Sequence, residues 1–190
     1  MRLVKYSVAA SLDGFIAGPN GEYDWIIMDP TVDFAALFAE FDTVLMGRRT
    51  FEVAQGQGSG GGSPGMKTLV FSRTLRAADY PGVTIVSDGA AQAVAQLKAA
   101  PGKNIWLMGG GGLFRSLLDA GLVDVIDVAL VPLMLGQGIP LVQPGKLRPP
   151  LRLTSTKTYP SGIVGLSYQV GTATPKGAAR SNKRSARKAR

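Results

Sequence analysis

Four consecutive glycines, residues 109–112, follow the apolar segment Ile105-Trp-Leu-Met and precede Leu113 and Phe114. The apolar segment predicts a buried strand, and the residues after the glycines open a helix. Because glycines let backbone amides approach a phosphate and a helix N-terminus carries a partial positive charge, the segment indicates a pyrophosphate site. The same glycines would also suit a strand-to-helix turn without a ligand. The spacing departs from G-x-G-x-x-G and follows the fifth predicted strand, so this is not the Rossmann fingerprint.

Two further strand ends carry groups that suit phosphate. One is the pair Arg48 and Arg49, and the other is the pair Ser72 and Arg73; each pair follows a short apolar run. A guanidinium binds phosphate through two parallel N–H donors, although either pair could also be an exposed polar end without a ligand. Ligands of open α/β sheets lie beyond the carboxyl ends of the strands. We therefore expect the three ends to converge there and to suit a dinucleotide with an extra 2′-phosphate.

Cysteine and histidine are both absent from the chain. Disulfides, zinc-thiolate sites and thiol nucleophiles are therefore excluded, as are Ser-His-Asp triads and histidine bases. Acid and base chemistry must come from carboxylates, lysine, tyrosine, water or a cofactor. No metal is expected.

The elements that would position these groups follow a βαβ order in the first part of the chain. Turn-forming clusters after residue 11 predict a loop, and residues 55–65 a flexible Gly/Ser-rich loop. The last strands have no helices between them, which predicts a mostly parallel α/β sheet with an antiparallel addition at its C-terminal end. The predicted strands are residues 3–10, 43–46, 68–71, 83–86, 105–108, 123–131, 151–158 and 163–170. The predicted helices run from Thr31 or Asp33 to about residue 41 and over residues 89–100 and 113–120, and a further short helix starts at the arginine pair that follows Gly47.

The length of 190 residues fits one domain, which we place at residues 1–171. The net charge is +8, but from Lys176 onward the chain has seven Lys or Arg and no acids, so the body is near neutral at +1. Residues 172–190 are expected to be a disordered basic tail, giving at most weak, sequence-independent binding to nucleic acid. No apolar run approaches the roughly 18 to 20 residues of a membrane span, and no signal peptide is evident. We therefore expect no membrane partner and a cytoplasmic location.

Five segments stand out together: Ser11-Leu-Asp-Gly-Phe-Ile-Ala, Leu45-Met-Gly-Arg-Arg-Thr-Phe, Leu69-Val-Phe-Ser-Arg, Leu107-Met-Gly-Gly-Gly-Gly-Leu-Phe and Pro132-Leu-Met-Leu-Gly-Gln-Gly-Ile-Pro-Leu. In this order they resemble the dihydrofolate reductase superfamily, and most closely the C-terminal reductase domain of the riboflavin enzyme RibD and its stand-alone relatives. The resemblance spans nearly all of the predicted domain. It implies a dihydrofolate-reductase-like three-layer α/β fold, with a mostly parallel central sheet, an antiparallel C-terminal strand and flanking helices.

The resemblance also implies that the chain binds NADPH. Its matches around the 2′-phosphate, the adenosine and part of the pyrophosphate are Gly47, Arg48, Arg49, Thr50, Ser72 and Arg73. Its matches at the pyrophosphate turn and the helix that follows are Met108, Gly110, Gly111, Gly112, Leu113 and Phe114. Ala9 and Ile16 match positions near the nicotinamide.

The catalytic acid is less clearly marked. Dihydrofolate reductases carry an acidic residue on the first helix, and Asp33 is the nearest candidate, about two positions off; it could instead cap the helix. The resemblance implies an NADPH-dependent reductase that transfers hydride to a small C=N or C=O substrate, such as a riboflavin-pathway ribosylaminopyrimidine or a pterin. Dihydrofolate reductase proper and a non-catalytic NADP-binding module are the alternatives. The expected partner is a small-molecule substrate, and a homodimer is left open.

Overall fold

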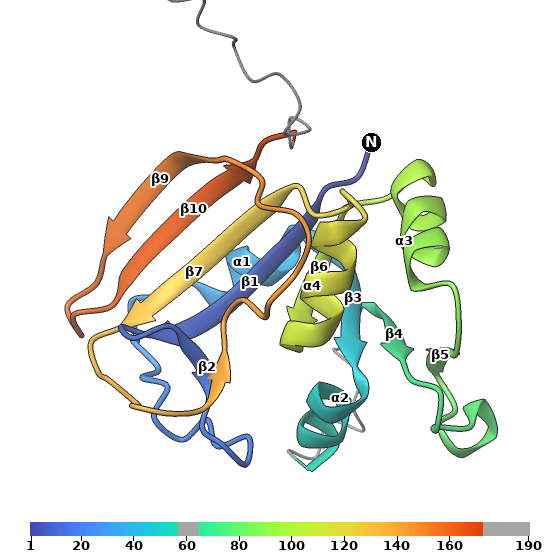
Figure 1. Ribbon diagram of the computed structural model, residues 1–190, viewed down its shortest axis with the longest axis horizontal. Coiled ribbons are helices and arrows are strands. Elements are labelled where there is room, and N and C mark those ends of the chain that lie inside the picture. The colour runs from blue at the N-terminus through green and yellow to red at the C-terminus, as the bar shows by residue number, and fades with distance from the viewer. Residues whose placement is uncertain (57–64, 173–190) are drawn as a thin grey trace, which may run out of the picture.

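Eight strands form the central sheet of the computed structural model, which describes residues 1–56 and 65–172 (Figure 1). Their order across the sheet is β5-β4-β3-β6-β1-β7-β10-β9, and β2 and β8 form a separate two-stranded sheet. The strands are β1 (Val4–Ser11), β2 (Phe15–Ala17), β3 (Phe41–Gly47), β4 (Lys67–Phe71), β5 (Val83–Val86), β6 (Asn104–Gly109), β7 (Val125–Val131), β8 (Ile139–Pro140), β9 (Leu151–Thr158) and β10 (Val164–Val170). The helices are α1 (Phe34–Ala39), α2 (Arg48–Ala54), α3 (Ala90–Ala99), α4 (Gly111–Asp119) and a 3-10 turn, η2 (Ala77–Asp79).

Parallel pairing runs from β5 across the sheet to β7. Strand β10 then pairs antiparallel with both β7 and β9. The connections explain this pattern, because a helix lies between most of the parallel strands whereas a short turn joins β9 to β10. The predicted mostly parallel sheet with an antiparallel C-terminal addition is confirmed.

Helices lie on both faces of the sheet, which gives the predicted three layers. Because successive strand residues point to opposite faces, β3 contributes to two cores. Leu45 packs in a cluster with Phe114 of α4 and Val94 of α3. Met46 packs with Phe51 of α2 on the other face. Figure 1 shows α4 in front of the sheet and α1 behind it.

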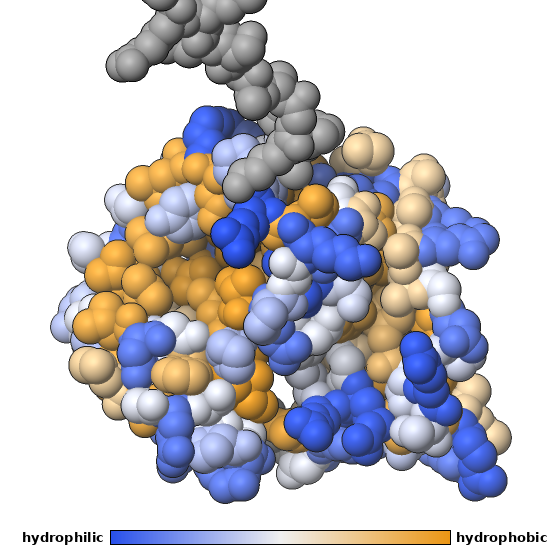
Figure 2. Space-filling view, in the orientation of Figure 1, coloured by the Kyte–Doolittle hydropathy of each residue, from blue (hydrophilic) through white to orange (hydrophobic). Residues whose placement is uncertain are grey.

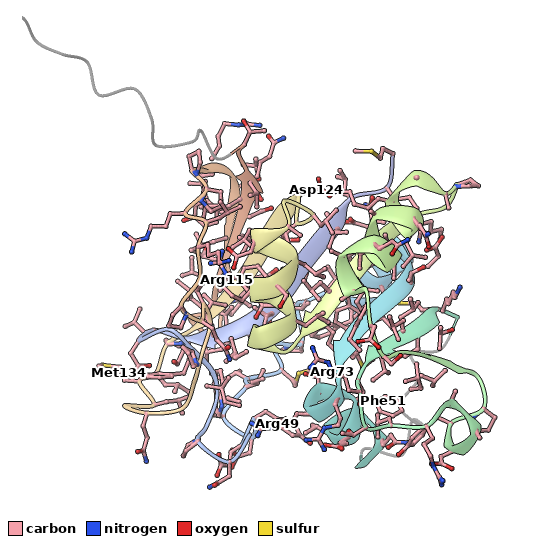
Figure 3. The ribbon with its side chains drawn as sticks, turned by 45° about the vertical axis from the view of Figure 1, so that its right-hand side comes forward. Arg49, Phe51, Arg73, Arg115, Asp124 and Met134 are labelled. Atoms are coloured by element: carbon pink, nitrogen blue, oxygen red, sulfur yellow. The ribbon has the colours of Figure 1, made fainter. Side chains whose placement is uncertain are left out.

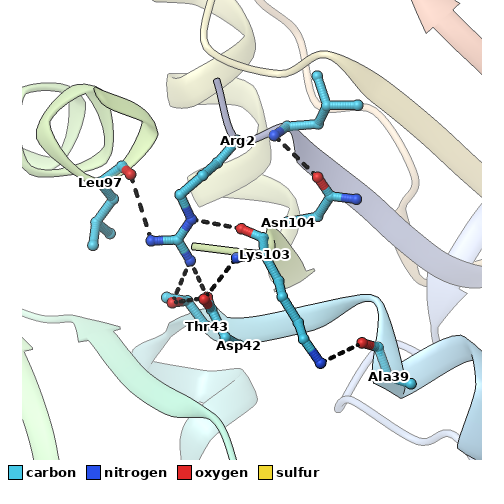
Figure 4. Close-up of polar contacts among 8 residues, drawn as sticks. Arg2, Ala39, Asp42, Thr43, Leu97, Lys103 and Asn104 are labelled. Carbon is cyan, nitrogen blue, oxygen red and sulfur yellow. Dashed lines mark hydrogen bonds and ion pairs between the residues drawn. The ribbon is translucent and has the colours of Figure 1, made fainter. Parts of the chain in front are cut away.

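A polar network ties together the amino-terminal ends of β1, β3 and β6 (Figure 4). The Arg2 guanidinium pairs with Asp42 and donates to Thr43 Oγ1 at 2.7 Å and to the Lys103 carbonyl at 2.6 Å. The Lys103 amide also donates to Asp42 Oδ2, at 2.8 Å. The guanidinium is buried, so its hydrogen bonds hold three adjacent strands in register. The predicted phosphate-binding residues follow the carboxyl ends of two of these strands, β3 and β6.

Two local features differ from the sequence expectations. The predicted loop after residue 11 contains β2, which pairs with β8 through Phe15 and Pro140. Helix α4 begins two residues earlier than predicted, at Gly111, because the first turn of a helix tolerates glycine better than its interior does. Most of the predicted loop at 55–65 and of the tail at 172–190 lies outside the described residues. Within the described part of the chain, no helix is long and apolar enough to cross a membrane.

Candidate cofactor and substrate site

Two of the three predicted strand ends meet at the carboxyl edge of the sheet. A Cβ atom placed on Gly47, at the end of β3, would lie 3.4 Å from the amide nitrogen of Gly110, which follows β6. A Cβ atom on Gly110 would lie 3.4 Å from Thr50 Oγ1, in the first turn of α2. The structure therefore brings together Gly47, Thr50 and Gly110, three residues that the sequence assigns to one phosphate site.

The turn between β6 and α4 offers backbone donors. Gly110 is the N-cap of α4, and its backbone is extended at φ −92°. The first amides of a helix have no intrahelical acceptor, and the helix dipole makes them attractive to an anion. Gly112 and Leu113 lie in this first turn and are at least partly accessible, and Met108 lies half-buried in β6 just before it. The peptide bond between Gly109 and Gly110 is cis.

Two arginines near α2 have no ion-pair or hydrogen-bond partner in the part of the chain that the structure describes. Arg49 in α2 and Arg73 after β4 are exposed, and neither makes an ion pair or side-chain hydrogen bond within the described residues. Figure 3 shows both side chains beside α2. Arg48 differs, because its guanidinium pairs with Glu52 one helical turn later, at 2.9 Å. Arg49 and Arg73 therefore supply the uncompensated positive charge of the site.

Two of the residues assigned to the cofactor, Ser72 and Phe114, make their contacts with other residues of the chain. Ser72 is buried, and its Oγ accepts from the Thr74 amide at 3.2 Å and the Leu75 amide at 3.1 Å, so it shapes the turn that presents Arg73. Phe114 is fully buried and stacks on Tyr6 with ring centroids 3.9 Å apart. Because the Phe114 amide also donates to the Gly110 carbonyl, Phe114 belongs to the core and has no group left for a cofactor.

The residues assigned to the nicotinamide lie further along the same edge. Ala9 is half-buried in β1, opposite Ala129 of β7. Ile16 lies in β2 and packs against the larger core cluster. Asp13, in the turn between β1 and β2, accepts from the amides of Leu135 and Gly136 at 3.1 and 2.7 Å. Hydrogen bonds from the Ser11 hydroxyl and from these amides lower the Asp13 pKa. The role of this carboxylate is therefore to fix the loop that follows β7.

Asp33 caps the first helix. Its Oδ1 accepts from the Ala36 amide at 2.8 Å, and α1 begins at the next residue, which confirms the capping interpretation. The carboxylate is exposed. Its assignment as the catalytic acid stays a prediction, because a capping carboxylate keeps lone pairs free for other donors.

Asp127 is a candidate that the sequence interpretation missed. It lies in the middle of β7, half-buried, on the sheet face that also carries Ala9. Its two carboxylate oxygens accept from Ser7 Oγ of β1 at 3.2 Å and from Ser167 Oγ of β10 at 2.5 Å. No cation pairs with it within the described residues. A lone acid inside the apolar run Val125-Ile-Asp-Val-Ala-Leu-Val is the signal that could have found it, since unpaired acids are rare in such strands.

The position of Asp127 relative to Ala9 is set by the strand register. Ser7 pairs with Asp127, and Ala9 with Ala129 two residues further along. Two residues of a strand span about 7 Å, about the width of a six-membered ring and its substituents. A planar substrate could therefore lie between the carboxylate and a nicotinamide placed against Ala9. The described residues contain no group of three or more acidic side chains that could hold a metal ion.

Comparisons with known proteins agree with this architecture. The model of the RibD C-terminal domain family matches residues 2–165. The uncharacterized protein YyaP of Bacillus subtilis (strain 168) is 36% identical over 178 residues, which cover 88% of this chain and 94% of YyaP. YwjB, another uncharacterized protein of the same strain, is 29% identical over 82% of this chain and 91% of its own.

Solved structures show the same fold. A putative riboflavin biosynthesis protein from Shewanella sp. PV-4 superimposes with a TM-score of 0.77 at 25% identity, covering 90% of this chain and 100% of that one. Dihydrofolate reductase from Enterococcus faecalis has a TM-score of 0.68 at 16% identity, covering 90% and 97%, so its likeness concerns the fold. Together with the family match over nearly the whole sheet, these findings show that the chain belongs to the RibD C-terminal domain family and has the dihydrofolate reductase fold.

Proposed function

We propose that this protein is an NADPH-dependent reductase that transfers hydride to a C=N or C=O bond of a small heterocyclic substrate. The observation that carries the proposal is the cluster of Gly47, Thr50 and Gly110, together with Arg49 and Arg73, whose side chains have no partner among the described residues. Backbone amides at a glycine turn suit a pyrophosphate, and two free guanidinium groups suit a further phosphate.

The residues present fit a phosphate-bearing cofactor. The side of Gly110 is open apart from Thr50 Oγ1, so backbone there is approachable by a large anion. Arg49 and Arg73 are exposed, so water solvates their charges in the free protein. When a phosphate binds, each guanidinium can form charge-assisted hydrogen bonds with it. Ala9 presents only a methyl group, so a flat ring can lie against β1.

NADPH, when bound, supplies the hydride. The chain's part is to place the substrate and its proton. Asp127 can accept hydrogen bonds from ring N–H or amino groups of the substrate, because Ser7 and Ser167 use only part of its acceptor capacity. The two serine hydroxyls hold the carboxylate in one orientation, which reduces the entropy cost of binding. The proton that accompanies hydride comes from water or from a carboxyl group such as Asp33.

The substrate class is proposed from relatives and from Asp127 together. A bifunctional enzyme from Thermotoga maritima, named a 5-amino-6-(5-phosphoribosylamino)uracil reductase in its second activity, has a TM-score of 0.66 at 18% identity, covering 89% of this chain and 56% of that one. Amino-substituted pyrimidines and pterins present adjacent N–H donors, which suit a carboxylate. We therefore place the substrate in this class.

The experiment is a titration of the protein with NADPH and NADH. One guanidinium–phosphate contact stabilises the NADPH complex by roughly 1.5 to 3 kcal/mol. Arg49→Gln and Arg73→Gln should therefore each weaken NADPH binding about tenfold or more. Neither change should alter the affinity for NADH, which lacks the 2′-phosphate. Arg76→Gln is the matched control, because Arg76 is exposed but already paired with Asp79.

Two outcomes would contradict parts of the proposal. Equal affinities for NADPH and NADH would remove the 2′-phosphate assignment. Tight NADPH binding without oxidation by the phosphoribosylaminouracil, dihydrofolate or simple carbonyl compounds would favour the non-catalytic binding module instead.

A further inference from the structure

The carboxyl edge of the sheet carries opposite charges at its two ends. The end beyond β3 and β4 carries Arg49 and Arg73, which have no ion-pair partner among the described residues. Three connecting segments lie at the end beyond β1, β7 and β9: residues 12–33, 132–138 and 159–163. We call these three segments the substrate rim. Figure 2 shows hydrophilic side chains at both ends of this edge, below β2 and over α2.

The substrate rim is one connected surface. The Leu12 amide donates to the Leu133 carbonyl at 2.8 Å. The Asp13 carboxylate accepts from two amides of the segment after β7, and the Asp29 carboxylate accepts from the Ser161 amide at 3.0 Å. These contacts join all three segments beyond the ends of β1 and β7, next to the space proposed for the nicotinamide and the substrate. A charge on any of the segments therefore acts on the same space.

All the charged side chains of the substrate rim are acidic. They are Asp13, Glu22, Asp24, Asp29 and Asp33. None of the five forms an ion pair with a lysine or arginine of the described chain. Hydrogen bonds from side chains and backbone amides lower the pKa of Asp13, Glu22 and Asp29, so these three carboxylates are charged at neutral pH.

Two lysines lie on the sheet face that carries Asp127, and each has a partner. Lys5 Nζ pairs with Glu40 at 2.6 Å, and Lys157 Nζ lies 4.7 Å from the centre of the Tyr159 ring. The carboxylates of this face and of the substrate rim outnumber these two cations. The net charge around the proposed substrate position is therefore negative, whereas the cofactor end of the edge is positive.

We propose that the substrate of this protein carries no phosphate or other anionic group. The inference rests on the proposed reductase activity and narrows the class of its substrate. A phosphate monoester carries roughly two negative charges at neutral pH, and carboxylates within about 10 Å repel it at ordinary salt concentrations. An enzyme can obtain specificity from charges that reject the wrong ligand. The substrate rim therefore favours neutral or protonated heterocycles over anionic ones.

This inference separates compounds that share the same reacting ring. The second activity of the Thermotoga maritima enzyme is named for a substrate with a phosphoribosyl group. In this chain such a phosphate would need a cationic partner, but Arg49 and Arg73 lie at the cofactor end of the edge. Dihydrofolate is disfavoured for the same reason, because its glutamate tail carries two carboxylates. An unphosphorylated aminopyrimidine or a neutral pterin keeps the N–H donors that suit Asp127 and adds no anion.

The test compares substrates that differ only in their anionic group, at saturating NADPH. One pair is 5-amino-6-(5-phosphoribosylamino)uracil and its dephosphorylated form, and the other is dihydrofolate and a dihydropterin without the glutamate tail. Within a pair, kcat/KM should be about tenfold or more higher for the member without the anion. The difference should shrink as the salt concentration rises, because salt screens the repulsion. An anionic member that is reduced as efficiently as its counterpart would overturn the inference.

Charge variants test whether the substrate rim causes this preference. Asp24→Lys places a cation on the rim at an exposed position, and should raise kcat/KM for the phosphorylated compound relative to its dephosphorylated form. Asp88→Lys is the matched control, because Asp88 is exposed and follows β5 at the other end of the edge. Its ratio of the two kcat/KM values should equal that of the wild type. An unchanged ratio in Asp24→Lys would contradict selection by the rim.

NADPH titration distinguishes a failure of this inference from a failure of the proposed function. All measurements use the full chain, which includes the basic residues from Lys176 onward. A protein that binds NADPH and reduces the phosphorylated compound preferentially would keep the proposed activity and overturn the inference about the substrate. A protein that does not bind NADPH would overturn both.

Discussion

Asp127 and Asp33 are the two carboxylates proposed to take part in the reaction, and their surroundings differ. Asp127 lies on the sheet face that carries Ala9 and is held by two serine hydroxyls. Asp33 lies at the start of α1 and is occupied in part by the Ala36 amide. The first arrangement suits a group that anchors a substrate in one orientation, and the second leaves an exposed carboxylate with lone pairs free for further donors.

Replacement by asparagine separates these roles at the level of single residues. Asp127→Asn keeps the shape but loses a charged acceptor, so we expect KM for the heterocyclic substrate to rise about tenfold or more while NADPH affinity is unchanged. Asp33→Asn keeps the helix cap, since asparagine caps as well as aspartate, and should lower kcat only if Asp33 carries the proton. Steady-state kinetics and cofactor titration measure both. An unchanged KM in Asp127→Asn would remove Asp127 from the substrate site.

The turn between β6 and α4 is the element on which the proposed cofactor binding would depend. Its glycines differ in what they can accept. Gly109 has a positive φ of 152°, which disfavours any side chain, and a Cβ atom on Gly111 would lie 3.3 Å from the Pro140 carbonyl oxygen. Gly110 has an ordinary extended backbone, and its nearest neighbour is Thr50 Oγ1. The fold therefore demands glycine at 109 and 111 more than at 110.

Gly110→Ala tests whether the turn binds a phosphate. The apo protein should unfold at nearly the wild-type temperature, because the backbone and the space both accept a methyl group. NADPH should stabilise the variant much less than the wild type, since the methyl group would block approach to the amides. Thermal unfolding with and without NADPH measures both. If the cofactor raises the unfolding temperature equally in the two proteins, the turn is only structural.

Across the whole molecule, the sequence predicted the features that depend on residues close together in the chain. Apolar runs and the glycine segment predicted the parallel strands and the meeting of Gly47, Thr50 and Gly110. The sequence could not place Asp127, because its partners Ser7 and Ser167 are 120 and 40 residues away and are joined only by the strand order. Strand β2 was missed for a similar reason, since three residues form a strand only because β8 supplies the hydrogen bonds.

Long-range contacts also join the loop before α1 to the far end of the chain. Asp29 is buried, and its carboxylate accepts from the Thr31 amide at 2.8 Å and from the Ser161 amide at 3.0 Å, in the turn between β9 and β10. Hydrogen bonds from Ser161 and Thr31 hold the pKa of Asp29 well below its usual range. The native state therefore binds this proton more weakly than the unfolded chain does.

Because the Asp29 pKa is lowered by folding, the folded protein loses stability in acid. Because the folded-state pKa of Asp29 is lowered, its contribution is present above the unfolded pKa of about 3.9 and is lost as pH falls toward the folded value. Asp29→Asn should therefore be less stable than the wild type at neutral pH, and the difference should shrink below about pH 4. Urea unfolding across this range measures it. Asp24→Asn is the control, because Asp24 is exposed and has no side-chain hydrogen bond within the described residues. Parallel stability curves for wild type and Asp29→Asn would show that another carboxylate governs acid unfolding.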